Sequence, residues 1–260
     1  MITSNPTPLT QDFFRGLQHI RHDQALHVSM PDNHIHALLN LGQPIKKTVV
    51  GQIRSTNILN GELHLFGCQS RSMLLECDQL DFIEIRIAPV YTRLLFPNCD
   101  GFLINQSERE LSPTLTNQED LIDYLLTSYT WETFETDYIL EEAIAQIIES
   151  KGDIKIRSIY ELLGISKSHL EQKFIQQIGL TAKEFAKVEK LNNFMRNYDQ
   201  YKDSMNLTQL TFRSGYYDQS HLIKDFRYFT DQRPGEFLKT YCHSSYSSPS
   251  LKCLNLMTTT

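Results

Sequence analysis

Two short segments of the chain carry side chains whose types and spacing suit recognition chemistry. Glutamine can pair with adenine in bidentate fashion, glutamate can accept a hydrogen bond from cytosine N4, and lysine can donate to guanine. The candidates for contact with base edges are Ser168, Glu171, Gln172, Gln219, Ser220 and Lys224. Basic groups near them suit phosphates, which set affinity but not sequence preference. These backbone candidates are Lys167, Lys173, His221, Arg227 and Arg233.

An internal repeat predicts how these side chains are positioned. The segments 156–164 and 207–215 each begin with an aliphatic residue and reach a glycine eight residues later. Each glycine is followed by a polar break and a second amphipathic stretch. Apolar residues four apart share one helix face, so the polar candidates lie on the opposite, outward face. The matching apolar positions are Leu170 with Leu222, Phe174 with Phe226, and Phe185 with Phe237.

The repeat has the features of a helix-turn-helix, which is a short helix, a turn containing glycine and a second helix. Ser158 and Glu161 have the spacing of a capping box for the first helix. Gly164 can adopt the positive φ that leaves that helix. Ser166 is a suitable N-cap for the second helix, and Asp218 can cap its counterpart in the second copy.

A plain helical bundle is the alternative, because many all-α proteins contain pairs of antiparallel helices. Two copies with matched glycines and matched core positions favour nucleic-acid binding over that alternative. Individual residues keep simpler interpretations as well. Glu171 could be a solvated acid that caps its own helix, and His221 could make a polar packing or phosphate contact. Tyr216 and Tyr217 suit core or backbone contacts better than base stacking.

The residues of the repeat resemble the AraC/XylS-type DNA-binding domain over about 153–241. In the first half the resemblance rests on Gly164-Ile165-Ser166-Lys167-Ser168-His169-Leu170, Phe174, Gly179-Leu180-Thr181 and Lys183-Glu184-Phe185. In the second half it rests on Gly215-Tyr216-Tyr217-Asp218-Gln219-Ser220-His221-Leu222, Asp225-Phe226, Phe229-Thr230, Pro234 and Glu236-Phe237. The sequence departs from the family pattern at three positions. Asp231 replaces a usual glycine, Thr211 stands where a small residue packs, and Ala182 occupies the place that Pro234 fills in the second copy.

The resemblance implies two helix-turn-helix units joined by a long helix over about 182–198. Each unit would lay its second helix in the major groove, in two segments about 34 Å apart on one face of DNA. The resemblance also implies a β-barrel-like N-terminal sensor for a small-molecule effector and RNA polymerase as a partner. The sequence leaves open whether the protein is a transcription activator or a repressor.

The rest of the chain predicts an α+β protein with a β-rich N-terminal part. Short segments at 34–41, 63–67 and 82–89 indicate strands. The last of them alternates, with Ile83, Ile85 and Ile87 on one face and Glu84 and Arg86 on the other. Helical spacing begins at 118–126 and returns at 138–150. We therefore predict a sensor domain at 1–115, a helical linker at 116–152, a DNA-binding domain at 153–241 and a flexible tail at 242–260.

The balance of basic and acidic side chains differs between the two parts of the chain. Residues 1–152 hold 10 basic and 20 acidic side chains, whereas residues 153–241 hold 14 and 11. A homodimer formed through residues 1–150 is a further expectation, because the apolar stripe of Ile139, Ala143 and Ile147 needs a partner. The alternative is that this stripe packs on its own barrel.

Several function classes find no support in the sequence. The five cysteines form no CxxC pair, so neither a disulfide framework nor a structural zinc site is expected. His34 and His36 could share a strand face, but the rest of a cupin-type metal motif is missing. Hydrolase, nucleotide-binding and zincin motifs are absent. We expect a cytoplasmic protein without enzyme activity, cofactor or membrane contact; the alternatives are an enzymatic N-terminal domain and a protein-interaction module.

Overall fold

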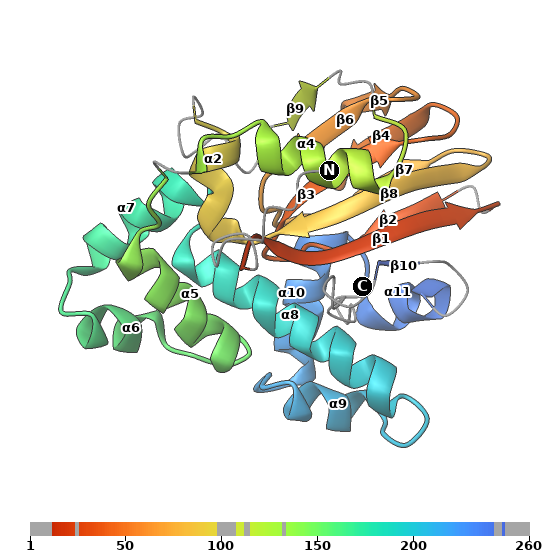
Figure 1. Ribbon diagram of the computed structural model, residues 1–260. Helices are drawn as coiled ribbons and strands as arrows, with labels where there is room; N and C mark the ends of the chain where they lie inside the picture. Colours follow the sequence, from red (N-terminus) through yellow and green to blue (C-terminus); the bar gives the residue numbers. More distant parts are fainter. Residues whose placement is uncertain are drawn as a thin grey trace, which may run out of the picture.

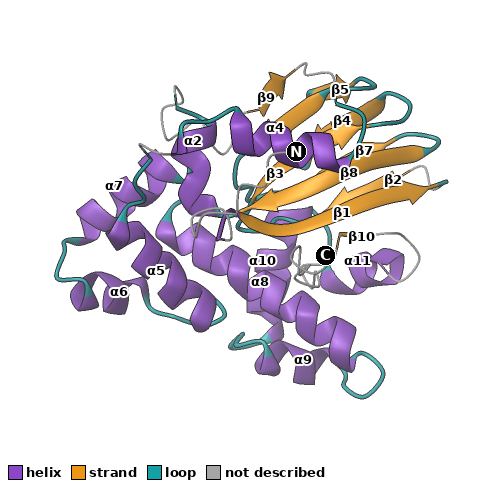
Figure 2. Ribbon diagram, viewed as in Figure 1, coloured by secondary structure: helices purple, strands orange, loops and turns teal. Residues whose placement is uncertain are grey.

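The computed structural model describes residues 12–23, 26–97, 108–111, 115–131, 134–241 and 246–247. Its strands gather in one half of the molecule and most of its helices in the other, as Figures 1 and 2 show. The strands form two five-stranded sheets, ordered β1-β8-β3-β6-β9 and β10-β2-β7-β4-β5. Every described pairing is antiparallel except that of β10 with β2.

Strands β1 to β8 follow one another closely between residues 14 and 87, whereas β9 and β10 come later in the chain. Their bounds are β1 Phe14–His22, β2 Leu26–Ser29, β3 Ile35–Asn40, β4 Ile45–Val49, β5 Ser55–Ile58, β6 Leu63–Phe66, β7 Met73–Glu76, β8 Leu80–Ile87, β9 Glu108–Leu111 and β10 Tyr246–Ser247. A 3-10 turn at Pro89–Tyr91 and the short helix α2 (Thr92–Leu95) follow β8. The three strands expected from the sequence correspond to β3, β6 and β8.

The central strands β8, β3 and β6 of the first sheet are buried on both faces, which explains their apolar sequences. Ile83, Ile85 and Ile87 of β8 join a core that also contains residues of the helices. The opposite face, with Leu38 and Phe82, packs with apolar side chains of the second sheet. Within the described residues the sheets keep separate edges and form no closed barrel, so the barrel-like expectation for this part is corrected to two sheets.

The longer helices lie between residues 118 and 241. Their bounds are α4 Gln118–Thr127, α5 Tyr138–Glu149, α6 Ile156–Leu162, α7 Lys167–Gln177, α8 Ala182–Tyr201, α9 Leu207–Arg213, α10 Gln219–Thr230 and α11 Pro234–Tyr241. The long helix α8 runs beside the sheets, with α6 and α7 toward one end and α9 at the other (Figure 1). This is the long connecting helix that the sequence predicts, extended by three residues.

The apolar stripe on α5 finds its partners within the chain. Ala143 and Ile147 are fully buried in the same core as Leu170 and Phe174 of α7, and Ile139 is half-buried. The helix packs against α6, α7 and α8. The stripe therefore needs no second copy for its burial, and the argument for a homodimer that rested on it falls away.

The domain boundaries drawn from the sequence remain predictions, but the cores cross them. Val28 and Met30 of the β-rich part pack in one core with α8, α10 and α11. Most of the tail at 242–260 lies outside the described residues. Its two described residues, Tyr246 and Ser247, pair with Val28 and Ser29 of β2, which differs from the flexible tail expected there.

Candidate nucleic-acid interface

The first helix-turn-helix unit consists of α6, a turn and α7. Gly164 in the turn has φ of 63°, as its position after a helix requires. Ser166 caps α7 by accepting a hydrogen bond from the backbone N–H of His169 at 3.1 Å. The expected capping box on α6 is wrong, since the helix begins at Ile156 with Lys155 as its N-cap, and Ser158 donates its hydroxyl to the Lys155 carbonyl at 2.7 Å.

The second unit repeats the arrangement with α9 and α10. Gly215 has φ of 83°, and Asp218 caps α10 through the backbone N–H of His221 at 2.8 Å. The helix ends at Asp231, whose φ of 60° shows that this residue accepts the left-handed conformation expected of the usual glycine. Thr211 is fully buried and donates its hydroxyl to the Leu207 carbonyl at 2.7 Å, so its polar group is satisfied within α9.

Both second helices bury the faces predicted from the repeat. Leu170, Phe174, Leu222 and Phe226 are at most 1% exposed. The ring centroids of Phe174 and Phe185 are 5.6 Å apart, which fixes α7 on α8. In the second unit Phe226 contacts Phe237 at 5.4 Å and a ring of α8 at 5.7 Å. Each helix is therefore held by its apolar side, and its opposite side carries most of the exposed polar residues.

Most of the predicted contact residues lie on those outward sides. The exposed ones are Lys167, Ser168, Gln172, Gln219, Ser220, His221, Lys224, Arg227 and Arg233. Gln219 donates from Nε2 to Thr208 Oγ1 at 2.6 Å, so α9 orients this amide at the first turn of α10. His221 lies edge-on to the Tyr216 ring at 5.4 Å, and its Nε2 is 3.7 Å from Asp225. These contacts support packing as part of the role of His221.

Two predicted contact residues in the first unit are engaged within the protein. The Glu171 carboxylate accepts a hydrogen bond from the backbone N–H of Ala182 at 3.1 Å, so it caps α8 rather than its own helix. Lys173 forms an ion pair with Asp137, which also accepts from Gln177 at 2.8 Å. Burial alone would raise the pKa of Asp137, but the hydrogen bonds from Lys173 and Gln177 hold that pKa below its usual value. Contact of either residue with DNA would compete with these links.

The β-rich part contacts the C-terminal end of the second recognition helix directly. The loop before β7 places the Arg71 guanidinium 4.1 Å from the centre of the Tyr228 ring, and Arg71 also donates to the Tyr228 carbonyl. The backbone N–H of Ser72 donates to the Phe229 carbonyl at 2.9 Å. The last carbonyls of a helix lack partners within it, so this loop satisfies groups that α10 leaves open. Sequence patterns gave no signal for this contact.

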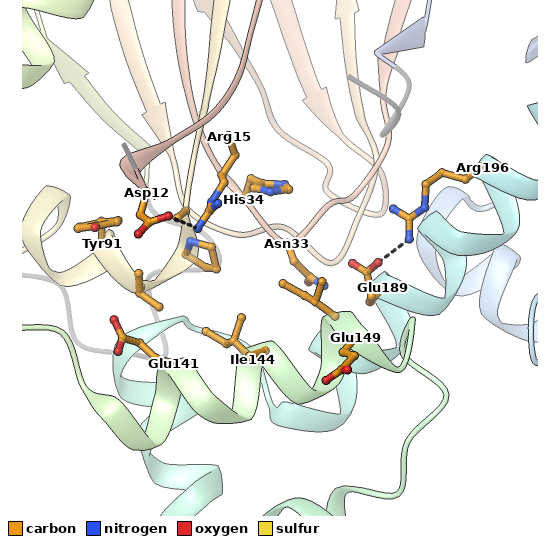
Figure 3. A pocket seen from close by; sticks show the side chains of 15 residues that line it. Asp12, Arg15, Asn33, His34, Tyr91, Glu141, Ile144, Glu149, Glu189 and Arg196 are labelled. Atoms are coloured by element: carbon orange, nitrogen blue, oxygen red, sulfur yellow. Dashed lines mark hydrogen bonds and ion pairs between the residues drawn. The ribbon is translucent and has the colours of Figure 1, made fainter. Parts of the chain in front are cut away.

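A cleft of about 900 Å³ separates the β-rich part from the helices, and Figure 3 shows its lining. One wall comes from the segments around residues 12–15, 33–34 and 88–91, the second from α5, and the third from Glu189 and Arg196 of α8. Helix α8 also links the two helix-turn-helix units. A ligand in this cleft would therefore contact the sheets, the linker and the helix that spaces the units.

A buried cluster of charged side chains lies next to Asn33 and His34, the loop residues that line the cleft. Its members are Asp32, His36, Glu84 and Arg86. His36 Nε2 lies 2.7 Å from Asp32 Oδ1, and Nδ1 lies 2.9 Å from Glu84 Oε1. The guanidinium of Arg86 is 3.3 Å from Asp32 Oδ2. All four side chains are nine-tenths buried or more, so the two acids and two bases compensate one another away from water.

Burial and charge oppose each other in this cluster, and charge prevails. Burial alone would lower the pKa of His36, but the carboxylates of Asp32 and Glu84 raise it to about 10. Burial would raise the pKa of Glu84, yet His36 and Arg86 lower it to about 2. Burial would also raise the pKa of Asp32. Attraction to His36, His34 and Arg86 outweighs burial and holds that pKa well below its usual range. The sequence placed Glu84 and Arg86 on the face opposite the isoleucines but did not indicate that this face is buried.

Comparison with known proteins identifies the C-terminal segment. Residues 159–240 match the family model described as helix-turn-helix domain. No curated protein matches the chain significantly. Within the described residues, no helix is both long and apolar enough to cross a bilayer, and no group of three or more His, Cys, Asp or Glu side chains could hold a metal. Of the five cysteines, Cys68 and Cys77 fall in the described ranges, and both are free thiols.

Solved structures show the same fold over most of the chain. ToxT from Vibrio cholerae is similar with a TM-score of 0.54 and 12% identity, covering 86% of this chain and 98% of ToxT. ToxT bound to (E)-4-(8-methylnaphthalen-1-yl)but-3-enoic acid is similar with a TM-score of 0.52 and 12% identity, covering 86% of this chain and 99% of ToxT. The AraC-like transcriptional activator CuxR covers 68% of this chain and 76% of CuxR at 15% identity, with a TM-score of 0.30 that carries no argument about the fold.

Proposed function

We propose that this chain is a sequence-specific DNA-binding transcription regulator that reads two adjacent major-groove segments with α7 and α10. The observation that carries the proposal is the pair of helix-turn-helix units, each with a buried apolar face and an exposed polar face on its second helix. The match of residues 159–240 to the helix-turn-helix family supports it. An arrangement of two such helices on one protomer suits two grooves one helical turn apart.

The roles of the polar side chains follow from their exposure. Ser168, Gln172, Gln219, Ser220 and Lys224 are the base-reading candidates whose side chains are exposed. Lys167, Arg227 and Arg233 are exposed cations that suit phosphate contact. Glu171 and Lys173 have a second role, since they tie α7 to α8 and to the start of α5. RNA polymerase is the partner that such a regulator would recruit when it acts as an activator.

We also propose that a small-molecule effector acts through the cleft between the sheets and the helices. The cleft volume falls within the range usual for binding sites of small molecules. ToxT, which shares the fold, has been crystallised with a small organic acid. Because α8 forms one wall, an occupied cleft would bias the placement of the two units relative to the sheets. The contact of Arg71 with the end of α10 offers a second route from the sheets to the recognition helix.

The DNA-binding proposal is tested by the salt dependence of binding. Each phosphate contact contributes about −0.9 to the slope of log affinity against log salt concentration for duplex DNA. The full-length protein is titrated with a fluorescent duplex at several salt concentrations. The double variant Arg227→Ala/Arg233→Ala should lower the slope by about two if both side chains contact phosphate. Lys46→Ala, which removes an exposed lysine paired with Glu76 on the second sheet, is the control and should leave the slope unchanged. Equal slopes for the wild type and the double variant would contradict the assignment of this face.

A further inference from the structure

The cleft carries more acid than base, and this imbalance bears on its ligand. The ionisable side chains that line it are Asp12, Arg15, His34, Glu141, Glu149, Glu189 and Arg196. Both arginines already have acidic partners. Arg15 lies 3.7 Å from Asp12, and Arg196 lies 2.6 Å from Glu189. Within the described residues, the carboxylates of Glu141 and Glu149 form no hydrogen bond or ion pair.

A buried acceptor lies at the same end of the cleft as Glu149. Asn33 is 3% exposed and donates from Nδ2 to the Phe185 carbonyl of α8 at 3.0 Å. Its Oδ1 is buried and receives no hydrogen bond within the described part of the chain. Figure 3 shows Asn33, Glu149 and Glu189 at one end, with Tyr91, Asp12 and Glu141 at the other. An amide oxygen and a carboxylate both accept hydrogen bonds, so a ligand bound at this end should present a hydrogen-bond donor.

The walls between the two ends are apolar. Helix α5 contributes Ile144, Ala145 and Ile148, which lie on one helix face. Ala88, Pro89 and Val90 lie opposite. Ile148 is 48% exposed, a large fraction for an isoleucine that lines a cavity. Covering this surface with an apolar group would remove it from water.

We propose that the cleft binds an organic cation with an apolar body, whose ammonium group is held by Asn33 Oδ1 and the Glu149 carboxylate. The apolar body lies along Ile144 and Ile148. This rests on the proposed function, because it names the class of effector for the cleft described above. It also separates this chain from ToxT, whose crystallised ligand is a carboxylic acid. A carboxylate in this cleft would face four carboxylates against two arginines that are already paired with acids, so the balance of charge disfavours it.

A matched pair of probes tests the charge preference. The full-length protein is titrated by calorimetry with 4-phenylbutylamine and with 4-phenylbutanoate, which share an apolar body and differ in charge. We expect saturable binding of the amine and weaker or no binding of the acid. Glu149→Gln should weaken the amine about three- to fivefold, the range of a partly exposed ion pair. Glu149→Lys should abolish the preference or reverse it, and Ile148→Ala should weaken both probes by a similar factor.

Two controls keep the result separate from general charge effects and from DNA binding. Glu119→Gln removes an exposed carboxylate on α4, outside the cleft, and should leave the amine affinity unchanged. Glu149→Gln should bind DNA as the wild type does in the absence of a ligand, which shows that the variant is folded. The proposal is overturned if the acid binds as tightly as the amine, if Glu149→Gln and Glu119→Gln have equal effects, or if the amine shows no saturable binding at millimolar concentration. None of these outcomes alters the DNA-binding proposal, which stands or falls on the salt slope.

Discussion

The buried cluster around His36 predicts that the stability of the protein falls as the pH rises above neutrality. The pKa of His36 is raised from 6.5 to about 10 because the carboxylates of Asp32 and Glu84 favour the imidazolium, although burial opposes it. A raised pKa stabilises the folded state fully below the unfolded value of 6.5. That contribution is then lost as the pH rises through the folded value near 10. The shift is about 3.5 units at about 1.4 kcal/mol each, so the loss is at most about 5 kcal/mol.

Urea unfolding followed by circular dichroism, repeated between pH 6 and pH 10, measures this loss. We expect the free energy of unfolding of the wild type to fall with a slope of up to about 1.4 kcal/mol per pH unit above pH 6.5. His36→Gln should be less stable at pH 6, because it leaves two buried acids with one base, and it should lack the extra slope. His169→Gln removes an exposed imidazole on α7 and serves as the control. Parallel curves for the wild type and His36→Gln would refute the reasoning, since groups other than His36 would then account for the pH dependence.

Four further predictions concern the two units and their contacts. Phe226→Ala should destabilise the second unit by about 3–5 kcal/mol, as measured by thermal or chemical unfolding, because it empties a fully buried ring position. Gln219→Ala should leave stability unchanged and flatten base preference at one or two positions, at about 1–3 kcal/mol, in a binding assay against single-base variants of a bound site. Lys167→Ala should lower the salt slope of DNA binding by about one, whereas Lys173→Ala should chiefly lower stability through its lost ion pair with α5. Arg71→Ala should destabilise the protein by about 1–2 kcal/mol and speed amide hydrogen exchange at the end of α10, and unchanged exchange there would count against a coupling role for this contact.

The local features of the units could be predicted from the sequence because their physics is local. The positive φ of Gly164 and the caps at Ser166 and Asp218 depend on residues within one or two turns. Helix spacing likewise identified the buried faces of α7 and α10. The one local error, the capping box at Ser158, came from placing the start of α6 three residues too late.

What could not be predicted depends on contacts between distant segments. Lys173 meets Asp137 at a separation of 36 residues, and Arg71 meets Tyr228 at a separation of 157. A spacing rule within one helix contains no information about either pair. The burial of the β8 face that carries Glu84 and Arg86 could not be predicted either. Polar residues that alternate with isoleucines give the same pattern whether the polar face meets water or a buried partner. The cleft follows from the packing of the sheets on α5 and α8, so it had no sequence signal.

The central claim, that two recognition helices on one protomer read two neighbouring grooves, is tested most directly by selection from a randomised DNA duplex library. The full-length protein is incubated with the library at moderate salt, and the bound fraction is sequenced over several rounds. The structure predicts enriched sites with two constrained blocks whose centres lie about 10 base pairs apart, one helical turn. Enrichment of one block only would assign sequence reading to one unit and make the other a backbone contact. Bound DNA with no enriched sequence at any position would contradict the account.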